Sequence, residues 1–209
     1  MGLIVQLTAL TSGKISSLQE LLTARGTLYA LPFPRRPQSM FDGAEMPVAI
    51  LISVPGVQNQ FVTSRVGRIY TEERPSILAT TILNPHLIRV NSSRIAKIGR
   101  HIESEIYQKI AARRGSVKDL VVNSSKHVVY YQEACRYWLK AWKGIPYFKR
   151  NGENISPPHG RFAYLNSSKA AEFSGCLLNS SLFYWYYSVL SDCEHVNDEL
   201  VKNMPIPNN

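Results

Sequence analysis

The sequence has few cysteines and lacks any long apolar run. Its three cysteines, Cys135, Cys176 and Cys193, are widely spaced and form no C-x-x-C pair, which argues against a disulfide framework and a zinc site. No apolar stretch approaches the length of a bilayer-spanning helix, and the apolar start has no basic flank or cleavage site of a signal peptide. These absences predict a cytoplasmic protein that makes no membrane contact.

The motifs of several common chemistries are also missing. The five histidines are scattered without the spacing of metal ligands. We find no phosphate-binding P-loop, no nucleophile elbow, and no cluster of acids with a lysine of the kind that nucleases use. The sequence therefore predicts no catalytic residue and no metal ligand in this chain.

Acidic residues are scarce in one segment, and this scarcity produces the net charge of +9. Residues 94–150 contain 13 Lys and Arg against 4 Asp and Glu, whereas the rest of the chain holds 11 of each. A lone basic helix would be explained by a solvated charged face. Because the excess continues over several predicted elements, it favours a polyanion such as nucleic acid as partner.

The apolar pattern of the first 65 residues predicts an α/β arrangement. We expect a strand over residues 3–9, a helix over 17–26, and strands over 27–33, 47–54 and 60–64, the last two as a hairpin. This is too few strands for a complete doubly wound domain. A boundary is predicted between residues 70 and 90.

The rest of the chain has a mixed pattern. Isoleucines at steps of three and four predict one helix over residues 94–114, and a second long helix is expected over 168–190. Strands are expected over residues 120–122 and 127–131. Four Asn-Ser-Ser triplets are interpreted as turns and helix caps; they begin at Asn91, Asn123, Asn166 and Asn179.

Basic and aromatic residues alternate between residues 136 and 150. Trp138 and Trp142 are four residues apart, so they would share one face of a helix. We expect these two side chains, and the aromatic run over residues 183–187, to pack in the core rather than to stack on bases.

Three stretches carry a resemblance to a known family. Residues 29–44 read YALPFPRRPQSMFDGA and lead into an apolar strand, residues 69–78 read IYTEERPSIL, and residues 176–187 read CLLNSSLFYWYY before a closing MPIP. In order and spacing they resemble the post-catalytic part of adenine-specific DNA methyltransferases of bacterial type II restriction-modification systems. None of the three is a catalytic signature alone.

The resemblance also identifies what the sequence does not contain. The family binds S-adenosylmethionine with a glycine-containing loop and holds the adenine amino group with an Asn/Asp-Pro-Pro-Tyr/Phe tetrapeptide; neither is present, and Ser156-Pro-Pro-His offers neither the amide nor the aromatic ring. The chain is therefore expected to hold no cofactor itself. A separate or upstream catalytic segment would bind S-adenosylmethionine in the complete enzyme.

The resemblance implies a fold and a function. The fold is α/β: residues 1–75 would be the edge of a methyltransferase (Rossmann-like) sheet, and residues 76–209 a mixed α+β domain that recognises the DNA target. The chain would be the DNA-binding rear portion of a site-specific adenine-N6 methyltransferase, with double-stranded DNA as partner. The alternative is a non-enzymatic basic module that binds nucleic acid or confers specificity on a separate catalytic subunit.

The resemblance also implies particular site residues. Phe33 matches the family aromatic that packs against the adenine after it leaves the helix; the alternative is an ordinary core residue at a strand end. Arg35 and Arg36 would contact the DNA backbone beside it. Further phosphate contacts are expected from basic residues of the second domain: Arg94, Lys97, Arg100, Arg113, Arg114, Lys140, Lys143, Lys149 and Arg150.

Overall fold

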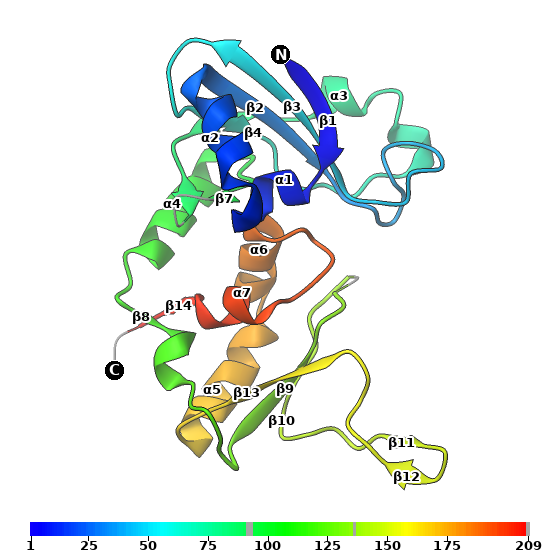
Figure 1. Cartoon of the computed structure of the whole chain (residues 1–209), viewed down its shortest axis with the longest axis vertical. Coiled ribbons are helices and arrows are strands. Elements are labelled where there is room, and N and C mark those ends of the chain that lie inside the picture. Colours follow the sequence, from blue (N-terminus) through cyan, green and yellow to red (C-terminus); the bar gives the residue numbers. More distant parts are fainter. Residues whose placement is uncertain (91–93, 136, 208–209) are drawn as a thin grey trace. The chain divides into compact units, whose positions relative to one another are not determined.

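The computed structural model describes residues 1–90, 94–135 and 137–207. The chain forms two compact units, the first from residues 1–108 with 188–193 and the second from residues 109–187 with 194–209. This division differs from the expected boundary between residues 70 and 90. Residues 76–108 belong to the first unit, and a short segment returns to it late in the chain (Figure 1).

A five-stranded mixed sheet forms the centre of the first unit (Figure 1). Its order is β1-β3-β2-β4-β5, where the strands are β1 (Gly2–Gln6), β2 (Gly26–Phe33), β3 (Val48–Pro55), β4 (Phe61–Thr63) and β5 (Asn84–His86). β3 runs antiparallel to both β1 and β2, and β4 pairs with β2 in parallel. The predicted α/β pattern is confirmed, but the predicted hairpin of the third and fourth strands is wrong because β4 pairs with β2.

One face of this sheet is covered by the helices α1 (Thr8–Thr11) and α2 (Ser16–Ala24), joined by the short turn η1 (Gly13–Ile15). Leucines of the helices pack against alternate residues of the strands, since side chains alternate between the faces of a strand. The buried cluster comprises Leu7, Leu10, Leu22, Leu28, Ala30, Ala49, Leu51, Phe61 and Ile95. Burial of this apolar surface is the main stabilising term of the unit.

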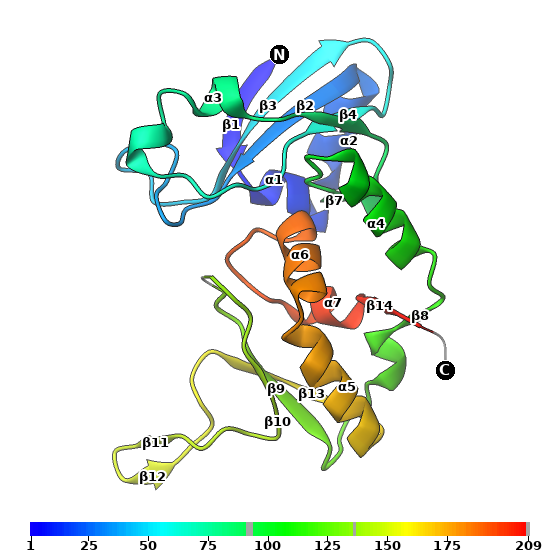
Figure 2. The same cartoon turned by 180° about the vertical axis from the view of Figure 1, so that it is seen from behind.

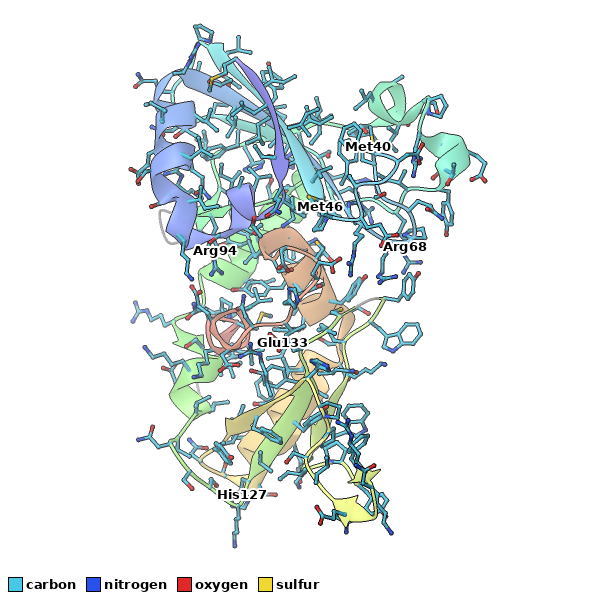
Figure 3. All side chains as sticks on the ribbon, turned by 45° about the vertical axis from the view of Figure 1, so that its right-hand side comes forward. Met40, Met46, Arg68, Arg94, His127 and Glu133 are labelled. Atoms are coloured by element: carbon cyan, nitrogen blue, oxygen red, sulfur yellow. The ribbon has the colours of Figure 1, made fainter. Side chains whose placement is uncertain are left out.

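The opposite face of the sheet is covered only in part. At one end Leu31, Phe33, Val48 and Ile69 form a second cluster, against which Met40 packs (Figure 3). Two short helical turns follow in the chain, η2 (Thr71–Glu73) and α3 (Ile77–Thr80). Toward the edge strand β1 the same face exposes aliphatic side chains, those of Ile4 and Ile52 being 61% and 42% exposed.

The predicted helix over residues 94–114 is wrong in its first third. The chain is extended through β6 (Arg89–Val90) and β7 (Arg94–Ile95), and α4 begins only at His101 and ends at Ala111. The reason is a tertiary contact: the Ile98 N–H donates to Thr63 Oγ1 at 2.9 Å, and the Thr63 hydroxyl lies 2.9 Å from the Ile98 carbonyl. These bonds use the backbone groups that a helix would need.

The second unit contains a three-stranded antiparallel sheet with the order β10-β9-β13. Its strands are β9 (Val128–Gln132), β10 (Ala141–Lys143) and β13 (Gly160–Tyr164), and α5 (Ser168–Leu178) packs against β9 and β10 (Figure 2). A small hairpin of β11 (Lys149–Arg150) and β12 (Glu153–Asn154) lies between β10 and β13 in the chain. The strand expected over residues 127–131 is confirmed as β9.

The long helix expected over residues 168–190 is divided into α5 and α6 (Ser181–Leu190). Asn179 ends α5 because its side chain bonds the backbone of Ala141, accepting from its N–H at 3.1 Å and donating to its carbonyl at 2.9 Å. Ser180 then caps α6 by accepting from the Phe183 N–H. The aromatic run here is confirmed as core, since Phe183, Tyr186 and Tyr187 are buried.

The remaining elements of the second unit are short. They are β8 (Gly115–Ser116), η3 (Val117–Leu120), α7 (Asp198–Lys202) and β14 (Pro205–Ile206), and β14 pairs with β8. The strand expected over residues 120–122 is instead the end of η3 followed by a single bridge from Val121 to Leu165.

The interpretation of the Asn-Ser-Ser triplets as caps and turns is confirmed where they are described. Ser167 caps α5 by accepting from the Ala170 N–H, Ser180 caps α6, and Ser125 accepts from the His127 N–H in a turn. The triplet that begins at Asn91, like Arg136 in the basic and aromatic stretch, lies outside the described residues.

Candidate nucleobase pocket

A small pocket lies in the first unit where β2 ends. Its volume is about 190 Å³, somewhat more than the roughly 150 Å³ of a cavity that holds a benzene ring. The apolar part of the lining comes from Pro32, Phe33, Ile69, Ile77 and Ile82. The pocket therefore has the size and the apolar walls that suit one heterocyclic ring rather than a larger ligand.

Phe33 has two roles in this arrangement. It is the last residue of β2 and is 3% exposed, packed among Leu31, Val48 and Ile69. It also lines the pocket. The structure thus places Phe33 in the core, as the alternative interpretation expects, and at the wall of a cavity, as the stacking interpretation requires.

Two exposed arginines, Arg65 and Arg100, complete the lining of the pocket. They come from segments that pass very close to each other: a Cβ atom built on Gly99 would lie 2.5 Å from the Arg65 backbone nitrogen. No Asp or Glu is among the described lining residues. The pocket therefore combines an apolar wall with a positive surface, which favours an anionic ligand with a flat ring.

A buried hydrogen-bond network at Thr63 and Ile98 holds the segments of Arg65 and Arg100 beside each other. His86 Nε2 lies 2.8 Å from Thr63 Oγ1, and His86 Nδ1 accepts from the Ile88 N–H at 3.1 Å. Burial lowers the pKa of His86 to about 4, against a smaller opposing effect of the Ala96 carbonyl. The ring is therefore neutral at neutral pH, with its proton on Nε2.

Lys97 was predicted to contact DNA phosphate, and its position corrects that prediction. The side chain is 1% exposed, and its ammonium donates to the carbonyls of Val189 at 3.0 Å and Ser191 at 2.6 Å. Burial lowers its pKa to about 8, while Cys193 and Asp192 act in the opposite direction. An ammonium held in the core does not reach a phosphate, so the prediction that Lys97 contacts DNA is wrong.

The other predicted contacts of the first unit lie outside the pocket lining. Arg35 and Arg36 are half-buried in the loop that follows Phe33, and Arg94 is half-buried in β7 (Figure 3). Of the predicted basic residues in this unit, only Arg100 lines the pocket. Arg35 and Arg36 are therefore close to Phe33 in the sequence but do not line the same pocket.

The predicted contacts of the second unit are solvent-exposed: Arg113, Arg114, Lys140, Lys143, Lys149 and Arg150. Lys143 differs from the others because its ammonium forms an ion pair with Glu172 and donates to Ser168 Oγ at 3.1 Å. This pairing reduces the positive charge that Lys143 presents to a polyanion.

Two features of the structure were not predicted. Arg65 was missed because it lies outside the basic segment; its only signal is its position directly after an apolar strand. In the second unit, Arg161 bridges Glu133 and Asp198 at 2.6 and 3.1 Å, and the Tyr131 hydroxyl donates to Asp198 at 2.7 Å. That network is internally paired and contributes little free charge.

No known protein-family model matches this chain, and no curated protein matches it. Among the described residues, no group of three or more His, Cys, Asp or Glu side chains is placed to hold a metal ion. In the same part of the chain, every helix is too short or too polar to cross a lipid bilayer.

The contact between Gly99 and Arg65 gives a direct test of how the pocket is built. We expect Gly99→Ala to lower the free energy of unfolding by about 1–3 kcal/mol, because the new methyl group must push two backbone segments apart. Gly67→Ala is the matched control: Gly67 also lines the pocket, but its added Cβ meets nothing within 4 Å. Urea unfolding curves measure both, and equal losses would refute this account of the packing.

Proposed function

We propose that this chain binds duplex DNA as the rear part of a site-specific adenine-N6 DNA methyltransferase. The observation that carries the proposal is the pocket that Phe33 lines together with Arg65 and Arg100. In the complete enzyme, a separate or upstream catalytic segment would bind S-adenosylmethionine and transfer the methyl group. This chain would supply DNA contacts and one wall of the base pocket.

The chemistry of a base-modifying enzyme explains why such a pocket would be needed. The amino group of adenine is enclosed in the base stack of a duplex, so the enzyme must extrude the nucleotide and hold it in a pocket. Phe33 lines the pocket at 3% exposure, so a base entering the pocket would meet the small part of this side chain that the core leaves open. Arg65 and Arg100 would neutralise the phosphates that flank it, because guanidinium groups bind phosphate with paired hydrogen bonds.

The edge of the first sheet supports the part of the proposal that concerns a missing catalytic segment. β1 is an outer strand of the sheet and pairs only with β3 within the described residues. The backbone groups along its outer side are therefore open to a further strand. A Rossmann-like sheet that continued beyond β1 would join the catalytic strands at this edge.

Charge supports the DNA contact itself. By sequence the first unit has a net charge of +3, from 11 basic and 8 acidic residues, and the second has +6, from 13 and 7. Both units are thus attracted to a polyanion, and each phosphate neutralised releases counterions. Binding governed by this effect weakens steeply as salt is added.

The proposal is tested by the affinity of the chain for duplex DNA across a salt series, measured by fluorescence anisotropy. We expect the double variant Arg65→Gln, Arg100→Gln to lose affinity about tenfold and to show a salt dependence shallower by roughly two phosphate contacts. Arg25→Gln is the matched control, since Arg25 is exposed at the end of α2 and does not line the pocket. An equal loss of affinity in Arg25→Gln would show that the pocket is not part of the DNA-binding site.

Two further outcomes decide the identity of the partner. No binding of duplex DNA even at low salt would refute the proposal as a whole. Tighter binding of a structured RNA than of duplex DNA would instead favour the non-enzymatic nucleic-acid-binding module.

A further inference from the structure

The three-stranded sheet of the second unit has an aromatic row across one face. Trp142 of β10 and Phe162 of β13 both pair with Tyr130 of β9, so the three side chains share that face. Their ring centroids are 5.7 Å apart for Tyr130 and Trp142 and 5.6 Å apart for Tyr130 and Phe162. The row lies on the face that α5 does not cover, because the residues that alternate with it, such as Ala141 and Val129, are buried on the other face.

A glycine fixes the central ring of the row. A Cβ atom built on Gly160 would lie 2.0 Å from the ring of Tyr130, so this ring occupies the space that a side chain would take. Tyr130 is consequently buried between its two neighbours at 4% exposure. The row is thus held in place by packing at its centre, and Trp142 is its solvent-exposed member.

The segment around Trp142 is unusually rich in exposed rings. Trp138, Trp142 and Tyr147 are 63%, 47% and 77% exposed, and Tyr137 is also exposed. This corrects the expectation that Trp138 and Trp142 pack in the core. The two residues do not share a helix: Trp142 lies in β10, and Trp138 precedes that strand.

A basic side chain lies on this face. The Gln132 N–H donates to the Lys140 carbonyl at 3.0 Å, which continues the β9–β10 ladder by one step and places Lys140 on the same face as Trp142. No Asp or Glu occurs between residues 134 and 152. Glu133 alternates to the opposite face, where it pairs with Arg161.

We propose that this face, defined by Tyr130, Lys140, Trp142 and Phe162, binds unpaired nucleobases of a nucleic-acid strand. Bases stack on exposed aromatic rings irrespective of their sequence, and a basic residue beside the ring neutralises the phosphate. A protein or peptide partner with acidic residues would use the charge but would not require stacking on Trp142. The inference goes beyond the proposed function, because it concerns a site for unpaired bases in the second unit.

The test is titration of the full chain with a single-stranded oligothymidylate at low salt, followed by anisotropy. We expect Trp142→Ala to lower the affinity about tenfold and Trp142→Phe to restore most of it, because the ring is retained. Lys140→Gln should weaken binding several-fold and reduce the salt dependence by about one phosphate contact. Lys169→Gln is the matched control: Lys169 is exposed on α5, which covers the opposite face of the sheet, so its loss should leave the affinity unchanged.

Three outcomes would overturn the inference. They are failure to bind oligothymidylate at low salt, an equal affinity for polyglutamate, and an equal loss of affinity for fully paired duplex DNA in Trp142→Ala. A chain that binds oligothymidylate but not duplex DNA would refute the proposed function and leave this site standing. If Trp142→Ala shows no cooperative melt, the Lys140→Gln result decides, and unchanged affinity in that variant refutes the site.

Discussion

Replacing Lys97 with alanine is expected to lower the free energy of unfolding by about 4 kcal/mol. The substitution removes the ammonium from the carbonyls of Val189 and Ser191, of which Val189 still accepts from the Lys97 N–H at 3.1 Å, and it leaves a cavity where the aliphatic stem packed. The Ser191 carbonyl then keeps only the weak Cys193 thiol donor at 3.9 Å, and a buried acceptor that loses its partner costs roughly 1–3 kcal/mol. The release of a buried ammonium, whose pKa burial has lowered to about 8, offsets part of this loss.

Two comparison variants separate the contributions at Lys97. Lys97→Met keeps the volume of the stem but not the donors, so it should retain about half of the lost stability. Lys118→Ala removes an exposed lysine and should change stability by less than about 0.5 kcal/mol. Urea unfolding of the three variants is the measurement, and a neutral Lys97→Ala would mean that the two carbonyls do not depend on this side chain.

Lowering the pH from 6.5 toward 4 is expected to destabilise the fold by up to about 3 kcal/mol through His86 alone. Burial lowers the pKa of His86 from 6.5 to about 4. Between these values the unfolded chain binds a proton that the folded chain does not, so stability is complete above pH 6.5 and declines as the pH falls. Protonation would also place a donor at Nδ1, which accepts from the Ile88 N–H.

Carboxylates titrate in the same pH range, so the contribution of His86 is obtained by comparing the wild type with His86→Gln. The free energy of unfolding of the wild type should fall more steeply between pH 6.5 and 4 than that of His86→Gln. His159→Asn, which alters an exposed histidine of the second unit, is the matched control. Parallel curves for wild type and His86→Gln would show that His86 does not control acid stability.

The apolar strands of the first sheet could be predicted because each is a local signal. Runs such as that of β3 bury alternate residues against the helices, and their composition indicates a strand without any knowledge of the partner. The pairing of β4 with β2 was not predicted from the chain. The predicted hairpin of β3 and β4 depends on the rule that strands adjacent in the sequence pair with each other, and here β4 pairs with β2 instead.

The segment over residues 94–114 shows where periodicity fails. Its isoleucines are spaced like a helix face, yet Ile95 and Ile98 are buried in extended chain and Ile102 is 55% exposed on α4. The decisive contact comes from Thr63, over thirty residues away in the sequence. A contact of that kind overrides local propensity, and no local pattern reports it.

The candidate pocket was predictable only in part. Phe33 was identified by its place in a motif, whereas Arg65 and Gly99 belong to no pattern and meet only because their segments cross. In the second unit, the spacing of four residues between Trp138 and Trp142 predicts a shared helix face in the core, and this prediction is wrong because both side chains are exposed. Trp142 is exposed because it lies in β10, and this strand of three residues is too short for its sequence pattern to predict it.

The return of residues 188–193 to the first unit limits how the protein can be rearranged. A shortened chain ending at residue 108 would lack the two carbonyls that hold the Lys97 ammonium. The second unit is interrupted in the same way, and the chain passes between the two units three times: within α4, within α6, and between residues 193 and 194. Recombination between relatives could therefore exchange neither unit as one continuous stretch, because each is built from two separate segments of the chain.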